Sequence, residues 1–279
     1  AKTHTPDHAL YYTDELIENL QLRWGEGFMS PGGAEELARM LRALPVAGAR
    51  VLDFGCGIGG YDALLIEAHG AAHVTGVDID AASLDAAQAM AARRGLQGRL
   101  TFCHVAPGPL PFADGSFDLV FSKDAIVDLP EKAPAFDELR RVLAPGGHIV
   151  VGDWFRSEAP MTPEMRAWAG DGEETYEMET LAGAAGHLAR AGFTGIETED
   201  RNEWFRALAR DEHERLAGPL HQTYVARFGA EQAARSVENA RIRALLADQG
   251  QLRPGHIRAR RPCACRRGPA TPGAAPPRP

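Results

Sequence analysis

Hydrophobic and polar positions change their spacing in regular blocks between residues 34 and 154. Short apolar runs of strand length alternate with stretches in which apolar residues recur every three or four positions, and Gly70 and Gly95 close two of these stretches. The predicted strands are 49–54, 73–79, 99–105, 116–122 and 148–154. The predicted helices are 34–44, 61–70, 81–95 and 131–147. This alternation predicts an α/β fold with a mostly parallel, doubly wound sheet.

The pattern changes after residue 154. Residues 158–175 are acidic and predict a loop. The later predicted elements are a helix at 178–193, a strand at 194–200, helices at 203–217 and 230–248, and a strand at 255–261. We expect a single domain over 1–262, in which helical N-terminal and C-terminal additions form a cap. Its parts are a lid at 8–45, the sheet core at 46–155 and a substrate cap at 156–262, followed by a disordered Pro-rich tail at 263–279.

Composition excludes several classes of protein. The chain has 279 residues, of which 44% are hydrophobic and 24% charged, as in an ordinary globular domain. The net charge is −8, and seven arginines without an acid lie from Gln251 onward, so the remainder carries −15 (−8 minus 7). An acidic body argues against a nucleic-acid partner. We expect a small-molecule substrate and a monomer or homodimer.

Segments for targeting, membrane insertion and metal binding are not expected. No apolar run approaches the ~20 residues that span a bilayer, and the first residues, AKTHTPDHAL, lack the apolar core of a signal peptide. A cytoplasmic location without a membrane partner is therefore the expectation. Cys263 and Cys265 form a Cys-x-Cys without a second ligand pair, so no metal site is predicted.

The segment 51–60, VLDFGCGIGG, carries the strongest chemical signal. A glycine-rich turn after a strand allows a ligand to approach the backbone and presents N–H groups to it. Asp53 stands two residues before Gly55, where a carboxylate would repel a pyrophosphate but would suit a ligand that carries a cationic amino group. Asp78 ends the second predicted strand, at the position where an acid holds ribose hydroxyls in doubly wound nucleotide sites.

These residues, together with the later blocks LPFADGSFDLVFS and VLAPGGHIVVGDW, resemble class I S-adenosylmethionine (SAM) methyltransferases. The resemblance implies a Rossmann-like sheet and SAM as the cofactor. It places Asp53, Gly55 and Gly57 along the methionine end of SAM, and Asp78 with Ile79 at the ribose. The stretch 105–107, Val-Ala-Pro, lacks the acid that the family often uses for adenine.

The flanking segments 11–33 and 121–130 resemble phosphoethanolamine N-methyltransferases, with glycine, sarcosine and dimethylglycine methyltransferases as near relatives. By matched position, Tyr12 lies over the reacting amine, and Asp128 stands where those enzymes carry the histidine of a Tyr–His pair. These two residues are the catalytic candidates. The implied substrate-binding residues are Asp124, Trp154, Tyr176 and Arg243, and the further cofactor-binding residues are Ser30 and Lys123.

The acceptor amine must be neutral when it attacks the methyl group, and an aspartate can take its proton or serve as its counter-ion. Glu174 replaces an arginine at the phosphate side of the relatives, so we expect a small polar amine without a phosphate. Transfer to oxygen, sulfur or carbon and SAM binding without catalysis remain alternatives, whereas a nicotinamide oxidoreductase is disfavoured. Structural roles also stay open: Asp128 as a helix cap, Trp154 as core and Arg243 in a salt bridge.

Overall fold

The computed structural model describes residues 12–169 and 178–263. Within them, seven strands form one sheet in the order β3–β2–β1–β4–β5–β7–β6. Strands β1 to β5 run parallel, and β7 pairs antiparallel with both β5 and β6. The strands are β1 (Arg50–Phe54), β2 (His73–Asp78), β3 (Leu100–His104), β4 (Phe117–Lys123), β5 (Leu143–Asp153), β6 (Thr194–Asp200) and β7 (Gly255–Arg260).

Helices cover both faces of this sheet, as the sequence pattern predicts. The sheet-covering helices are α2 (Gly33–Met40), α3 (Gly60–Glu67), α4 (Ala81–Arg93), α5 (Lys132–Val142) and α7 (Leu181–Arg190). Adjacent strand residues point to opposite faces: Val51 packs in the core under α2, α3 and α4, whereas Leu52 packs in the core under α5 and α7. Both are fully buried.

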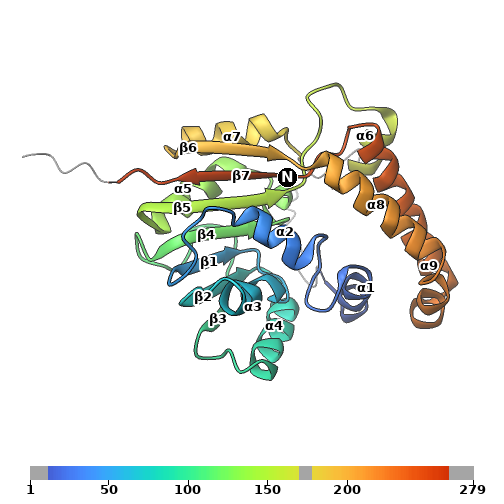
Figure 1. Cartoon of the computed structure of the whole chain (residues 1–279), viewed down its shortest axis with the longest axis horizontal. Helices are drawn as coiled ribbons and strands as arrows, with labels where there is room; N and C mark the ends of the chain where they lie inside the picture. Colours follow the sequence, from blue (N-terminus) through green and yellow to red (C-terminus); the bar gives the residue numbers. More distant parts are fainter. Residues whose placement is uncertain (1–11, 170–177, 264–279) are drawn as a thin grey trace, which may run out of the picture.

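The remaining helices gather beyond the carboxyl ends of the parallel strands, at the right of Figure 1. They are α1 (Asp14–Trp24), α6 (Pro163–Ala169), α8 (Asn202–Ala217) and α9 (His221–Asp248), and a 3-10 turn, η1 (Ile126–Asp128), follows β4. Helix α9 changes direction at Gly229, whose φ of 83° leaves the helical region. The chain therefore places its cap over the strand ends where doubly wound folds bind ligands.

Several predicted elements differ from the observed ones, and the helix predicted at 230–248 begins earlier, at His221, as α9. The predicted helix 131–147 ends at Val142, because Leu143 adopts an extended conformation and pairs with Phe117 as the first residue of β5. Helix α6 lies in the segment predicted to be a loop. Thr162 accepts the N–H of Met165 and Pro163 opens the helix, a start signal that the acidic composition obscured.

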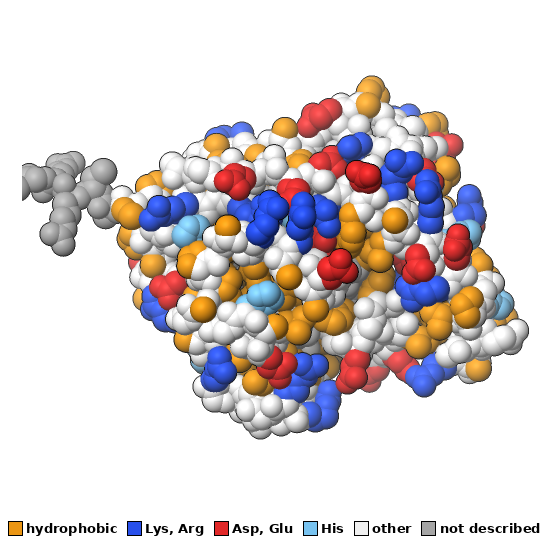
Figure 2. Space-filling model, viewed as in Figure 1, with side chains coloured by type: hydrophobic (Ala, Val, Ile, Leu, Met, Phe, Trp, Pro, Cys, Tyr) orange, Lys and Arg blue, Asp and Glu red, His pale blue; other side chains and the backbone are white. Residues whose placement is uncertain are grey.

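Figure 2 shows acidic and basic side chains interspersed over one face of the molecule, with hydrophobic side chains gathered near its centre. Among the described residues, no helix is both long and apolar enough to cross a membrane.

Candidate active site

The glycine loop after β1 is tightly enclosed by its neighbours. The N–H groups of Gly55 and Cys56 donate to the carbonyl of Val77, at 2.9 and 3.1 Å. Gly55 has a φ of 81°, and a Cβ there would lie 2.2 Å from the Cβ of Ala125. Both the backbone conformation and the available space therefore require glycine at this position. The contact with Ala125 also brings the loop against the segment that carries Asp124 and η1.

Asp78 is oriented by backbone donors at the end of β2. Its carboxylate accepts the N–H of Gly57 at 2.8 Å and the N–H of Asp80 at 2.9 Å. Ile79, next in the chain, is 45% exposed, which is unusual for a large apolar side chain of this protein. An acid beside an uncovered apolar surface is an arrangement that suits the ribose and adenine of a nucleoside.

Asp53 lies beneath the glycine loop and faces a second carboxyl group, that of Asp62 on α3. Both side chains are buried, and their carboxyl groups interact directly. Burial, followed by the charge of Asp62, raises the pKa of Asp53. Burial raises the pKa of Asp62 to about 7. Two buried carboxyl groups in contact cannot both ionise readily, so the pair retains a proton around neutral pH.

The sequence reading missed Asp62. It is the one acid in the first turn of a helix whose other early positions are apolar, and this was the available signal. The Oδ1 atom of Asp53 and both carboxyl oxygens of Asp62 are buried without a donor among the described residues. A buried acceptor of this kind matches the requirement for a cationic amino group at the methionine end of SAM.

Lys123 and Asp124 form a buried ion pair at the carboxyl end of β4. Asp124 has a φ of 54°, which is uncommon for a residue other than glycine. Its N–H donates to the carbonyl of Gly152 at 2.8 Å, which fixes this conformation. Burial lowers the pKa of Lys123, but the neighbouring charges of Asp124 and Tyr61 outweigh burial and raise it overall. Lys123 is therefore held as a cation beside Asp124.

Asp128 ends the turn η1 and is solvent-exposed. Packing around its carboxyl group, and then the charge of Asp124, raise its pKa to about 6. It does not cap α5, whose N-cap is Glu131 without a side-chain hydrogen bond, so the helix-cap interpretation of Asp128 is wrong. A surface carboxyl group that titrates near neutral pH can act as a proton acceptor.

Trp154 follows β5 and lies half-buried between the sheet and the cap. Its ring packs edge-on against Phe205 of α8, with ring centroids 5.0 Å apart. It lines a cavity together with Lys123 and Asp124, which we call the Asp124 cavity. Further lining residues are Pro31, Glu36, Gly152, Asp153, Trp204, Pro254, Gly255 and His256. Trp154 thus has both a packing role and a face toward the predicted acceptor region.

Glu36, Trp204 and His256 are lining residues that the sequence reading missed. They come from α2, α8 and β7, and His256 contacts Glu36 with 2.7 Å between Nε2 and Oε1. In the sequence, each of these residues lies within a predicted helix or strand and belongs to no motif. No local pattern indicates that they meet at one cavity.

The remaining candidates fall in different places. Tyr12 begins the described chain just before α1, and Ser30 interacts with the hydroxyl of Tyr61. Tyr176 and Glu174 lie outside the described residues. Arg243 on α9 forms an ion pair with the buried Glu212 of α8. This matches the salt-bridge interpretation of Arg243, and its role in substrate binding stays a prediction.

Comparisons with known proteins agree with this fold. A family model described as "Methyltransferase domain" matches residues 45–208, more than half of the chain. The chain belongs to this methyltransferase-domain family. The predicted class I methyltransferase, and SAM as its cofactor, are thereby confirmed at the level of the family.

Two curated relatives carry the name phosphoethanolamine N-methyltransferase. Phosphoethanolamine N-methyltransferase 1 from Arabidopsis thaliana is 30% identical over 206 residues, which are 74% of this chain and 41% of that protein. The protein of the same name from Triticum aestivum is 31% identical over 192 residues, which are 67% of this chain and 37% of that protein. The chain therefore spans less than half the length of these curated relatives.

Two solved structures share the fold. Phosphoethanolamine N-methyltransferase 2 from Haemonchus contortus, in complex with phosphomonomethylethanolamine and S-adenosylhomocysteine, has a TM-score of 0.83 at 23% identity and covers 91% of this chain and 59% of its own. A putative sarcosine dimethylglycine methyltransferase from Galdieria sulphuraria has a TM-score of 0.73 at 20% identity, with 90% and 91% covered. At these identities the likeness shows a common fold.

Proposed function

We propose that this protein transfers the methyl group of SAM to the nitrogen of a small polar amine, with Asp128 as the proton acceptor. The observation that carries the proposal is the position of Asp128: an exposed carboxyl group with a pKa of about 6, at the end of the 3-10 turn whose preceding residue, Ala125, packs against Gly55 of the glycine loop. Tyr12 is the proposed partner that positions the amine.

In this proposal, Asp53, Gly55, Gly57 and Ser30 hold the methionine end of the cofactor, and Lys123 lies close to it. Asp78 and Ile79 hold the ribose. When bound, SAM supplies a methyl group on a sulfonium. The orphaned Oδ1 of Asp53 and the uncovered side chain of Ile79 support this assignment.

The chain's own residues would then prepare the acceptor. An amine enters largely as an ammonium ion, and Asp128 removes a proton so that a nitrogen lone pair becomes available. Asp124 supplies negative charge on the same side, and the face of Trp154 can hold a methylated ammonium through a cation–π contact. Since Asp128 is exposed, it can pass the proton to solvent.

The charges around the Asp124 cavity support an acceptor without a phosphate. Its two cationic candidates among the described lining residues are already engaged, Lys123 with Asp124 and His256 with Glu36. Arg243 is likewise paired with Glu212. A phosphate dianion would therefore meet carboxylates whose cations are in use. This distinguishes the proposed acceptor from the one named in the plant relatives.

The test is a methyl-transfer assay with isotopically labelled SAM and an acceptor panel of glycine, sarcosine, ethanolamine, phosphoethanolamine and hydroxy acids. We expect label on the nitrogen of an unphosphorylated amine. Label on phosphoethanolamine alone would overturn the acceptor class, and label on oxygen or carbon alone would overturn transfer to nitrogen. SAM binding without turnover on the whole panel would favour a non-catalytic role.

A further inference from the structure

The turn η1, which presents Asp128, is held by a buried carboxyl group, that of Asp153. The Oδ2 atom of Asp153 accepts the N–H of Val127 at 2.9 Å, and its Oδ1 atom accepts the N–H of Trp154 at 2.8 Å. Asp153 is 3% exposed. Both of its oxygens therefore bind backbone groups, and they tie the end of β5 to the middle of the turn.

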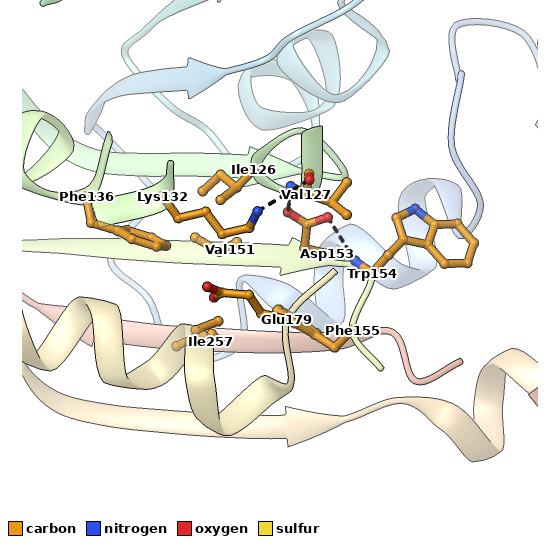
Figure 3. A pocket seen from close by; sticks show the side chains of 11 residues that line it. Ile126, Val127, Lys132, Phe136, Val151, Asp153, Trp154, Phe155, Glu179 and Ile257 are labelled. Carbon is orange, nitrogen blue, oxygen red and sulfur yellow. Dashed lines mark hydrogen bonds between the residues drawn. The ribbon is translucent and has the colours of Figure 1, made fainter. Parts of the chain in front are cut away.

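The turn is also held by a buried ammonium group, that of Lys132. The Nζ atom of Lys132 donates to the carbonyl of Leu129 at 2.9 Å and to that of Val127 at 3.4 Å. Figure 3 shows Lys132 reaching toward Val127 from the helix side of a small cavity, with Asp153 at its other end. Among the described residues, Lys132 has no carboxylate within ion-pair distance, so its positive charge is met by carbonyl dipoles.

We propose that Lys132 and Asp153 are positioning residues for Asp128: they hold η1 through the N–H and carbonyl groups of Val127 and the carbonyl of Leu129, and Lys132 keeps Asp128 available as a proton acceptor. The inference deepens the proposed function and rests on it. Asp128 itself contacts neither residue through a hydrogen bond in the structure, so both act through the turn and through charge.

The charges around Asp128 show why Lys132 matters. Apart from the packing around it, Asp124 and Asp78 raise the pKa of Asp128, and Lys132 lowers it. Asp153 also interacts with Asp128 through charge, and burial, followed by the charge of Asp124, raises the pKa of Asp153. Lys132 is therefore the positive group that opposes the surrounding acids. Without it, Asp128 would hold its proton to higher pH.

The experiment follows the carboxyl group of Asp128 directly. Protein carrying ¹³C-labelled aspartate carboxyl groups is titrated by NMR at low salt, and the Asp128 signal is assigned with Asp128→Asn. Lys132→Gln keeps a donor for the turn but removes the charge, and Lys132→Met removes both. We expect the midpoint of Asp128 to rise by roughly half to one pH unit in both variants. Lys132→Arg keeps the charge and should restore a midpoint near that of the wild type.

The kinetic readout should agree with the titration. A rise of about half a unit lowers the ionised fraction of Asp128 at pH 6 roughly twofold, so kcat should fall about twofold there and recover at pH 8. The KM for SAM should not change. Lys132→Met also removes the donor that holds the turn, so its KM for the acceptor should rise. Lys132→Gln keeps a donor, so its KM for the acceptor should rise less.

The outcomes separate this inference from the proposed function. A midpoint that rises in Lys132→Gln and returns in Lys132→Arg supports the inference even when no amine is methylated, because the titration needs no turnover. The opposite outcome is that the protein methylates an amine, but Lys132→Gln and Lys132→Met leave the titration midpoint of Asp128 and the pH profile of kcat unchanged. This result would overturn the inference and leave the proposed function intact. If Lys132→Met does not fold, the titration and kinetics of Lys132→Gln alone test the inference.

Discussion

Glu36 gives a quantitative test of how the lid is fastened to the sheet. It lies on α2, is 3% exposed, and binds two partners from distant parts of the chain. Arg201 donates to its two oxygens at 3.1 and 2.8 Å, and His256 lies 2.7 Å from Oε1. Burial raises the pKa of Glu36, but the hydrogen bonds from His256 and Arg201 outweigh burial and lower the pKa to about 2.

The sign and size of the effect follow from this pKa. The value falls from 4.5 in a free side chain to about 2, and each unit is worth about 1.4 kcal/mol, so the ionised Glu36 stabilises the fold by roughly 3 kcal/mol. This contribution is fully present above about pH 4.5 and is lost as the pH falls toward 2. Glu36→Gln should therefore lower the free energy of unfolding by roughly 3 kcal/mol at pH 7, and the difference from the wild type should shrink below pH 4.5.

Urea unfolding of both proteins at pH 7, 4 and 3 measures this difference. Glu35→Gln is the matched control, because Glu35 is the preceding residue of the same helix but is exposed, and its change should stay within about 0.5 kcal/mol. A loss in Glu36→Gln that has the same size at pH 3 as at pH 7 would refute the ionic account. It would mean that Glu36 acts through packing alone.

Three further predictions concern the site. In Gly60→Ala the new Cβ would lie 2.0 Å from the carbonyl oxygen of Gly27, so calorimetry should show SAM binding weakened at least about tenfold while the protein remains folded. Asp62 titrates at a pKa of about 7, so the affinity for SAM should rise between pH 6 and 8 as the buried carboxyl pair gains charge, and Asp62→Asn should flatten this rise. Lys123→Met leaves Asp124 buried without its cation, and urea unfolding should show a loss of roughly 3–5 kcal/mol.

The glycine loop and the class of the sheet could be predicted because their signals are local. A turn that requires glycine at Gly55 and an acid at the end of each of two strands, Asp53 and Asp78, are visible within short windows. Asp128 is different, because the resemblance of 121–130 to phosphoethanolamine N-methyltransferases indicated it, and its role stays a prediction. The alternation of strands and helices determined the rest of the core.

The parts that could not be predicted depend on contacts between distant segments. Glu36 and Arg201 are 165 positions apart, and nothing near either residue indicates the other. Arg243 is similar: its pairing with Glu212 depends on how α8 and α9 pack. The boundary of α5 was misplaced because the pairing of Leu143 with a neighbouring strand overrides its place in a helical pattern.

The carboxyl groups at this edge of the sheet raise a question about charge. Methyl transfer from a sulfonium disperses positive charge, so a site lined by ionised acids would stabilise the reactants more than the transition state. The structure limits this effect, because burial raises the pKa of Asp153, Asp53 shares a proton with Asp62, and Lys123 offsets part of the charge of Asp124. Asp128 is then the exposed carboxyl group of the site that gains and loses a proton near neutral pH, whereas the Asp53–Asp62 pair that also titrates there is buried. Rate acceleration in the proposed reaction would accordingly come from orientation and from deprotonation of the amine rather than from a strong negative field.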